Sequence, residues 1–338
     1  MVTVDPTDGL GQEELLRRLK EVAGRAALIA VPEGGFSIEL LNHSENSTYL
    51  ITKASTGERL ILRVHRTGYH SRAAIESELI WMEALRAEAG VHTPRVIAGP
   101  DGTRVHEVFT EALPGGRNCV FFEFLEGEEP DENDLISAFP NLGEVTAKMH
   151  RHVRGWRLPA GFERFRWDFD TALGRKPHWG HWYDGPAMTA PRRAVLARLV
   201  DAIGRRLERF GSEPERFGLV HCDMRLANLL VYQGDTRVID FDDCGFSWFL
   251  YDLAAALSFI EHRPDVPDLV SAWLQGYRRV ASVTPAEERE IPTFIMFRRM
   301  LLVAWIGSHA ETDLARQMGA DYTAVSCDLA EDYLGKFG

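Results

Sequence analysis

The chain has 338 residues, of which 45% are apolar and 26% are charged, proportions that predict a folded protein with one large or two smaller domains. Its formal net charge of −12 argues against a nucleic-acid-binding protein, because binding to a phosphate backbone needs clustered Lys and Arg. The four cysteines are scattered and lack the spacing of a metal site, which favours a reducing compartment. The N-terminus is acidic and does not resemble a signal sequence, and no run of about 18 apolar residues is present. These features favour a cytoplasmic protein that does not span a membrane.

Residues 1–125 are predicted to form an N-terminal lobe built on an antiparallel sheet of about five strands. The spacing of apolar residues predicts helices over 12–29 and 71–88. Strand-like runs separated by polar or Gly-containing turns lie at 36–41, 47–52, 59–64, 96–97, 105–110 and 118–125. The chain leaves the sheet after Leu125, so residues 126–338 are assigned to a second lobe.

Arg63 is a charged residue within the predicted strand 59–64. It stands between two apolar residues, so its side chain points to the opposite face of the sheet. Glu78, fifteen residues later, falls on the helix 71–88 and is the expected partner of Arg63, with Glu76 on a neighbouring face as the competitor. A guanidinium held by a carboxylate can also bind a phosphate.

The second lobe is predicted to be mainly helical, with helices over 130–152, 191–210, 253–261, 265–278, 284–307 and 312–337. Residues 155–185 follow neither a helical nor a strand period and are rich in Trp, Phe and Tyr. A long segment of this kind either covers a binding site as a lid or fills a small core of its own.

The stretch 218–252 carries the residues expected to do chemistry. A short apolar run leads to His221 and Asp223, and Asn228 follows five positions after Asp223. Two short strands joined by a Gly-Asp turn then lead to Asp240, so a hairpin brings Asn228 and Asp240 to adjacent strand ends. Phosphoryl transfer from ATP needs such a set: one carboxylate that orients a hydroxyl, and an amide and a second carboxylate that hold Mg²⁺.

The spacing H-x-D-x-x-x-x-N followed by D-x-D resembles the catalytic signature of kinases. The run IDFDDCG, followed by YDLA, resembles more closely the aminoglycoside phosphotransferase/choline kinase family, and within it homoserine kinase type II and the RdoA-like stress-response Ser/Thr kinases. The resemblance implies an α+β, two-lobed, protein-kinase-like fold with a small antiparallel-sheet N-lobe and a larger, mainly helical C-lobe. It also implies a kinase with ATP and Mg²⁺ as cofactors.

The resemblance further implies a role for individual residues. Asp223 is the catalytic base, Asn228 and Asp240 bind Mg²⁺, and His221 and Asp252 support the loop. The residues implied to contact the nucleotide are Ser44 and Asn46 in the first turn, Arg63 with Glu78, the Glu123 carbonyl, and the Leu125 N–H. Arg63 stands where the protein kinases have Lys.

The catalytic stretch departs from the family at two positions. Cys222 occupies a position where relatives usually have Gly, and a small packed side chain is the favoured interpretation over a redox group. Arg225 stands where His or Lys is common, and we expect it to stabilise the transferring phosphoryl group. Asp242 is a candidate ligand of a second Mg²⁺, and Asp243 is a candidate contact for the acceptor.

The expected acceptor is the hydroxyl of a small molecule, such as an amino alcohol, an amino acid, a sugar or an aminoglycoside-like compound. A protein Ser/Thr kinase of the stress-response type is the alternative enzyme, although no long activation segment follows Asp240. A nucleotide-binding module without transfer activity is the third hypothesis. Neither a nucleic-acid nor a membrane partner is expected, and the sequence leaves the oligomeric state open.

Overall fold

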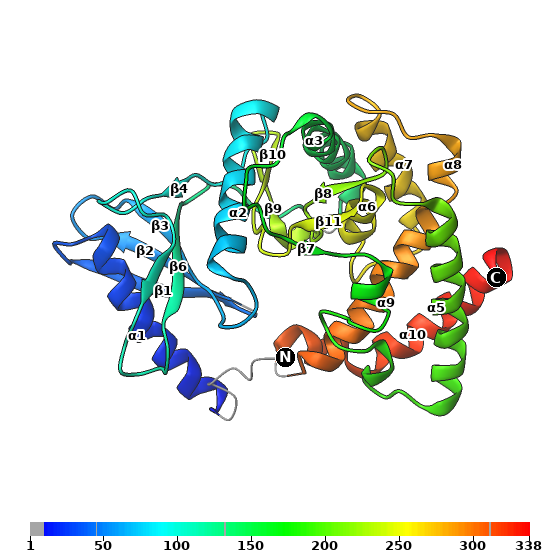
Figure 1. Ribbon diagram of the computed structural model, residues 1–338, viewed down its shortest axis with the longest axis horizontal. Coiled ribbons are helices and arrows are strands. Elements are labelled where there is room, and N and C mark those ends of the chain that lie inside the picture. The colour runs from blue at the N-terminus through cyan, green and yellow to red at the C-terminus, as the bar shows by residue number, and fades with distance from the viewer. Residues whose placement is uncertain (1–9, 45, 132, 311) are drawn as a thin grey trace. The chain divides into compact units, whose positions relative to one another are not determined.

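The computed structural model describes residues 10–44, 46–131, 133–310 and 312–338, and it divides into two compact units. An antiparallel sheet forms the centre of the first unit, whereas the second unit is mainly helical (Figure 1). This is the α+β, two-lobed fold that the resemblance implies. The first unit runs to Ala87 and also contains His92–Glu126 and Leu158–Glu163; the second contains Glu88–Val91, Gly127–Arg157 and Arg164–Gly338.

The sheet of the first unit has six strands, because the short strand β5 pairs with β6 in addition to the five strands of the main path. All of its strand pairs are antiparallel. Helix α1 (Gln12–Ala30) lies across the sheet and buries one apolar side, including Leu19 and Val22, in the core of this unit (Figure 1). The strands are β1 (Phe36–His43), β2 (Ser47–Lys53), β3 (Arg59–Val64), β4 (Val96–Ile97), β5 (His106–Val108) and β6 (Arg117–Glu123).

Helix α2 (Arg72–Ala84) follows β3 in the first unit. Ser71 caps its N-terminus, because the Ser71 hydroxyl accepts a hydrogen bond from Ala74 N at 3.0 Å. The helix then widens into the π-helical turn η1 (Leu85–Ala89). The predicted helix over 71–88 is therefore confirmed, with an irregular last turn.

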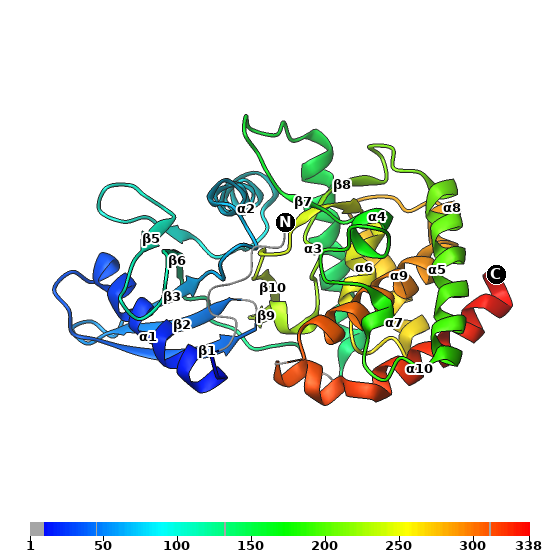
Figure 2. The same ribbon diagram turned by 60° about the horizontal axis from the view of Figure 1, so that its bottom comes forward.

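The second unit contains two small sheets in addition to its helices, and α10 crosses α5 (Figure 2). Strands β7 (Phe165–Arg166), β11 (Gly245–Trp248) and β8 (Phe217–Val220) form one sheet, and β9 (Leu229–Tyr232) and β10 (Asp235–Val238) form the predicted hairpin. The helices are α3 (Leu135–Gly155), α4 (Phe169–Ala172), α5 (Ala190–Phe210), α6 (Leu250–Ala256), α7 (Val266–Tyr277), α8 (Pro285–Glu288), α9 (Ile291–Ser308) and α10 (Asp313–Phe337), with 3-10 turns η2 (Trp182–Asp184) and η3 (Leu226–Asn228).

Three predicted helices differ from the structure. The helix over 130–152 begins later than predicted, since α3 starts at Leu135. The continuous helix over 284–307 is wrong, because the chain forms α8 and then α9, whose first turn contains Pro292. The helix over 253–261 is also wrong in its limits, since α6 begins at Leu250 and ends at Ala256. Phe259 has a φ of 71°, which a right-handed helix cannot contain.

Helix α9 is a core helix of the second unit. It is the one described helix whose length and mean hydropathy of 1.3 meet the requirements of a membrane span, yet 78% of that window is buried inside the protein. It also carries two arginines, Arg298 and Arg299, which are 2% and 1% exposed. Its apolar composition is thus explained by burial within this unit.

Helices α3 and α7 approach each other closely at two glycines. A β-carbon on Gly143 would collide with the Trp273 carbonyl, and a β-carbon on Gly276 would collide with the Pro140 carbonyl. Each position therefore needs a residue without a side chain.

Candidate active site

The loop after β8 is held in place through its backbone. The carboxylate of Asp252, in the first turn of α6, accepts hydrogen bonds from His221 N at 3.1 Å and from Cys222 N at 2.8 Å. His221 Nδ1 accepts a hydrogen bond from Asp223 N at 3.2 Å, and His221 Nε2 lies 3.1 Å from the Ile239 carbonyl oxygen. These contacts agree with the supporting roles expected for His221 and Asp252.

Cys222 adopts a φ of 67°, a conformation that glycine adopts more easily than a residue with a side chain. Such a conformation costs a residue with a side chain about 1–3 kcal/mol, so the surrounding contacts must hold it. Its thiol is buried and lies 3.7 Å from the Val220 carbonyl oxygen and 3.8 Å from that of Gly245. Burial raises the pKa of the Cys222 thiol well above its usual value, so this thiol is a packed side chain.

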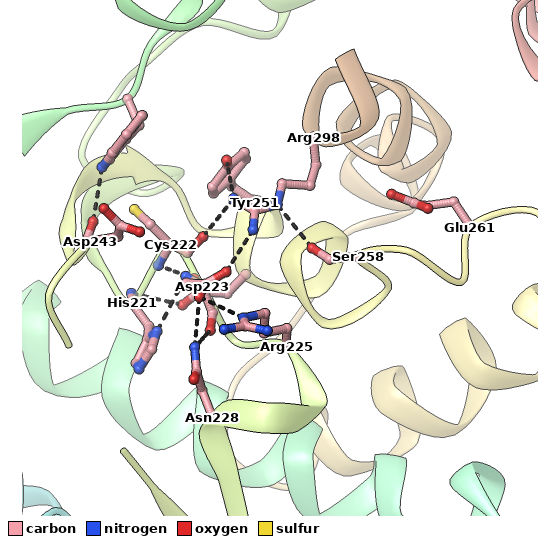
Figure 3. Close-up of polar contacts among 12 residues, drawn as sticks. His221, Cys222, Asp223, Arg225, Asn228, Asp243, Tyr251, Ser258, Glu261 and Arg298 are labelled. Carbon is pink, nitrogen blue, oxygen red and sulfur yellow. Dashed lines mark hydrogen bonds and ion pairs between the residues drawn. The ribbon is translucent and has the colours of Figure 1, made fainter. Parts of the chain in front are cut away.

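Both carboxylate oxygens of Asp223 accept hydrogen bonds from charged or amide groups (Figure 3). Arg298 Nη2 donates to Oδ1 at 2.6 Å, while Arg225 Nε at 3.1 Å and Asn228 Nδ2 at 2.6 Å donate to Oδ2. Burial alone would raise the pKa of Asp223, but Arg225 and Arg298 outweigh it, so the pKa is lowered. Asp223 is therefore ionised at neutral pH, and its side chain is 15% exposed.

The predicted hairpin brings Asn228 together with the residue that precedes Asp240. Leu229 pairs with Val238, and Ile239 N donates to the Asn228 carbonyl oxygen at 3.0 Å, so Asp240 directly follows the residue that is bonded to Asn228. Because Asn228 Nδ2 is bound to the Asp223 carbonyl and carboxylate oxygens, the amide oxygen of Asn228 faces away from Asp223. An amide oxygen and a carboxylate at adjacent positions fit the oxygen ligands that Mg²⁺ prefers.

The aromatic segment packs directly against the loop that contains Asp240. Trp167 Nε1 donates to the Asp243 carbonyl oxygen at 2.9 Å, and the Arg164 guanidinium donates to the carbonyl oxygens of Asp242 and Cys244. Trp179 lies 5.5 Å from the Arg298 guanidinium. Trp167 and Trp179 are 1% and 5% exposed, so in the second unit these two side chains are packed in the core beside the loop.

Arg63 and Glu78 form the predicted pair in the first unit. Arg63 Nη1 lies 2.7 Å from Glu78 Oε1, and the two side chains are 8% and 0% exposed. Glu76, the competing partner, instead forms an ion pair with Arg104 at 3.0 Å. The Arg63 guanidinium also lies 5.1 Å from the Phe122 ring, which fixes its orientation.

The other predicted nucleotide-binding residues lie at the ends of strands of the same unit. Ser44 N donates to the Asn46 carbonyl oxygen at 3.2 Å, and Asn46 Oδ1 accepts from Arg66 N at 3.1 Å, so the turn after β1 is tied to the end of β3. Glu123 ends β6, and its side chain accepts from Arg95 N at 2.9 Å. Leu125 follows two residues later, outside the strand.

The sequence analysis missed Arg298. It lies on α9, 75 residues after Asp223. Two adjacent arginines in a helix that is otherwise mainly apolar could have indicated this contact, because a buried charge needs a specific partner.

Residues 37–291 match the sequence model of the phosphotransferase enzyme family. The chain belongs to this family. The predicted relationship is thereby confirmed, and the protein is a phosphotransferase that acts on an alcohol group.

Relatives of this phosphotransferase include small-molecule kinases. A solved microcompartment-associated aminopropanol kinase is 44% identical, with a TM-score of 0.83 over 90% of this chain and 94% of that chain. Amicoumacin kinase of Bacillus subtilis (strain 168) is 26% identical over 79% of this chain and 80% of its own length. The amicoumacin kinase hAmiN, solved with AMP-PNP and Ca²⁺, is 23% identical and shares the fold, with a TM-score of 0.74 over 96% of both chains.

Proposed function

We propose that this phosphotransferase transfers the γ-phosphoryl group of ATP, bound with Mg²⁺, to the hydroxyl of a small amino alcohol. The arrangement around Asp223 carries this proposal: an ionised carboxylate, 15% exposed, accepts a hydrogen bond from Asn228, whose carbonyl oxygen is bonded to Ile239, the residue before Asp240. The amino-alcohol class is supported by the 44% identity with an aminopropanol kinase over 90% of the chain.

Asp223 is proposed to accept a hydrogen bond from the acceptor hydroxyl, to aim its oxygen at the phosphorus, and to take its proton. Two guanidinium groups on Asp223 make it a weak base, so the proton moves late, when the new P–O bond has made the hydroxyl acidic. Arg225, whose side chain is 27% exposed, offers its cation to the negative charge of the transferring group.

The other proposed roles are those that the family resemblance implies. Asn228 and Asp240 are proposed to hold a first Mg²⁺, and Asp242 a second one; when bound, Mg²⁺ neutralises charge on the phosphates. Arg63, held by Glu78, is proposed to bind phosphate oxygens, and Ser44 and Asn46 to face the phosphates. The Glu123 carbonyl and the Leu125 N–H are proposed to contact the adenine edge.

The decisive experiment measures ADP release from ATP and Mg²⁺ with a panel of amino alcohols, amino acids, sugars and aminoglycosides. Asp223→Ala is the blank, since loss of a general base typically costs about 10²–10⁴-fold. Amino-alcohol-dependent ADP that disappears in Asp223→Ala supports the proposal. ADP at the level of the blank with every small molecule, together with phosphorylation of a generic protein, would instead favour a protein kinase.

A further inference from the structure

The side chain of Arg298 extends from α9 toward the carboxylate of Asp223 (Figure 3). Its Nη2 donates to Asp223 Oδ1 at 2.6 Å, and its Nη1 donates to the Cys222 carbonyl oxygen at 3.2 Å. Nη1 also donates to the Tyr251 hydroxyl at 3.0 Å, and Nε donates to Ser258 Oγ at 2.9 Å. The three nitrogens thus have partners on the loop, on α6 and in the segment after α6.

These contacts hold two consecutive residues of the loop together. Asp252 accepts the N–H of Cys222, and Arg298 binds the carbonyl of the same residue, so both of its peptide groups are held in the unfavourable conformation with φ of 67°. The same guanidinium binds Asp223 Oδ1. The carboxylate is therefore fixed relative to the backbone that carries it.

Burial keeps Arg298 away from the reactants. Its side chain is 2% exposed, whereas that of Asp223 is 15% exposed, so the carboxylate and not the guanidinium can reach an acceptor. Stability alone is a weak reason for such a pair, because desolvation of buried ions costs several kcal/mol and apolar replacements are often equally stable.

We propose that Arg298 is a positioning residue, which holds the Asp223 carboxylate at the angle from which it meets the acceptor hydroxyl. The proposal rests on the proposed role of Asp223. Because Arg298 acts through Asp223, its loss lowers kcat and leaves the binding of ATP and of the acceptor almost unchanged.

The neighbouring Arg299 provides a matched control on the same helix. It is 1% exposed, and its contacts run to Glu261 at 2.7 Å and to Ser326 at 2.8 Å. Arg299 therefore has the same chemistry and burial as Arg298, but it joins α9 to α10 and to the segment after α6 rather than to the catalytic loop.

The experiment compares Arg298→Lys with Arg299→Lys in the full-length protein, by steady-state kinetics and thermal unfolding. One ammonium cannot span the partners of a guanidinium, so Arg298→Lys is expected to lower kcat about 100-fold, with KM values changed by at most a few-fold. Arg299→Lys is expected to lower the melting temperature similarly while kcat changes by at most a few-fold. In Arg298→Ala, millimolar guanidinium is expected to restore part of kcat.

The proposal is overturned if Arg298→Lys keeps the wild-type kcat, or if both lysine variants lose kcat in proportion to their melting temperatures. If Arg298→Lys does not fold, Tyr251→Phe replaces it, since this variant removes one partner of Arg298 and keeps the ring. A lower kcat with unchanged KM then supports the proposal, and a wild-type kcat overturns it. Activity in Asp223→Asn would refute the proposed function itself, which the Arg298 variants do not test.

Discussion

His150 Nε2 lies 3.0 Å from Asp252 Oδ2, although the two residues are 102 positions apart in the sequence. Both side chains are completely buried, and His150 Nδ1 lies 3.0 Å from the Tyr277 hydroxyl. Since Asp252 also accepts hydrogen bonds from the backbone of His221 and Cys222, a continuous set of hydrogen bonds joins α7 and α3 to the catalytic loop.

This contact predicts how the stability of the protein depends on pH. Burial lowers the pKa of His150 from its ordinary 6.5, although Asp252 acts in the opposite direction. Below about pH 6.5 this histidine binds a proton in the unfolded chain but stays neutral in the folded protein. The free energy of unfolding therefore falls by up to about 1.4 kcal/mol for each pH unit, until the pH reaches the pKa of His150 in the folded state.

His150→Gln tests this, because the glutamine amide can still donate to Asp252 but does not titrate. The variant is expected to be about 1 kcal/mol less stable at pH 7.5, since its contact with Tyr277 is lost. Unfolding by guanidinium chloride at pH 6.5 and at pH 5.5 should show that the free energy of unfolding falls less in His150→Gln than in the wild-type protein. Parallel curves for the two proteins would contradict the assignment to His150.

Asp240→Asn is expected to weaken the dependence of activity on Mg²⁺. The change keeps the shape of the side chain and removes a negative charge from the proposed ligand, so the Mg²⁺ concentration for half-maximal activity should rise at least about 10-fold. Asp235→Asn, exposed in the same hairpin, is the control and should leave it unchanged. Equal Mg²⁺ requirements in the two variants would exclude Asp240 as a ligand.

Glu78→Gln is expected to weaken ATP binding through Arg63. The buried guanidinium loses its charged partner, and loss of one charge-assisted hydrogen bond of about 1.5–3 kcal/mol corresponds to a KM for ATP that is at least about 10-fold higher. Glu76→Gln, on the same helix but paired with Arg104, should keep the wild-type KM. The assignment fails if both variants bind ATP equally well.

The cysteines are expected to differ sharply in their reaction with a thiol reagent. The thiols of Cys119, Cys222 and Cys244 are buried, and burial raises the pKa of Cys119 to about 12 and that of Cys222 well above its usual value. Only Cys327 is partly accessible. The native protein should therefore release about one equivalent of chromophore from an aromatic disulfide reagent, and the denatured protein about four. Rapid reaction of a second thiol in the native protein would contradict the packed state of Cys222.

Local sequence patterns were enough to predict which candidate residues lie on the same turn and hairpin. Asp223, Asn228 and Asp240 are joined by a short turn and a hairpin, whose geometry follows from strand and turn preferences. The pair of Arg63 and Glu78 could be predicted for a similar reason, because a strand and the helix that follows it determine which side chains face each other.

Contacts between elements that are distant in the sequence could not be predicted from such local patterns. Arg298 on α9 contacts Asp223, and His150 on α3 contacts Asp252, and no periodicity within either helix specifies these partners. The helix over 284–307 was extended through Pro292 because a proline suits the first turn of a new helix, and an apolar pattern continues across such a break.

The close approach of α3 and α7 at Gly143 and Gly276 limits how this enzyme can evolve. A methyl group at either glycine must push the helices apart, and these helices carry His150 and Tyr277, which support the catalytic loop through Asp252. In a growth selection on random variants, both glycines should stay as invariant as Asp223 although neither meets a reactant. Alanine at either position should yield temperature-sensitive alleles, so changes of acceptor preference have to arise elsewhere in the chain.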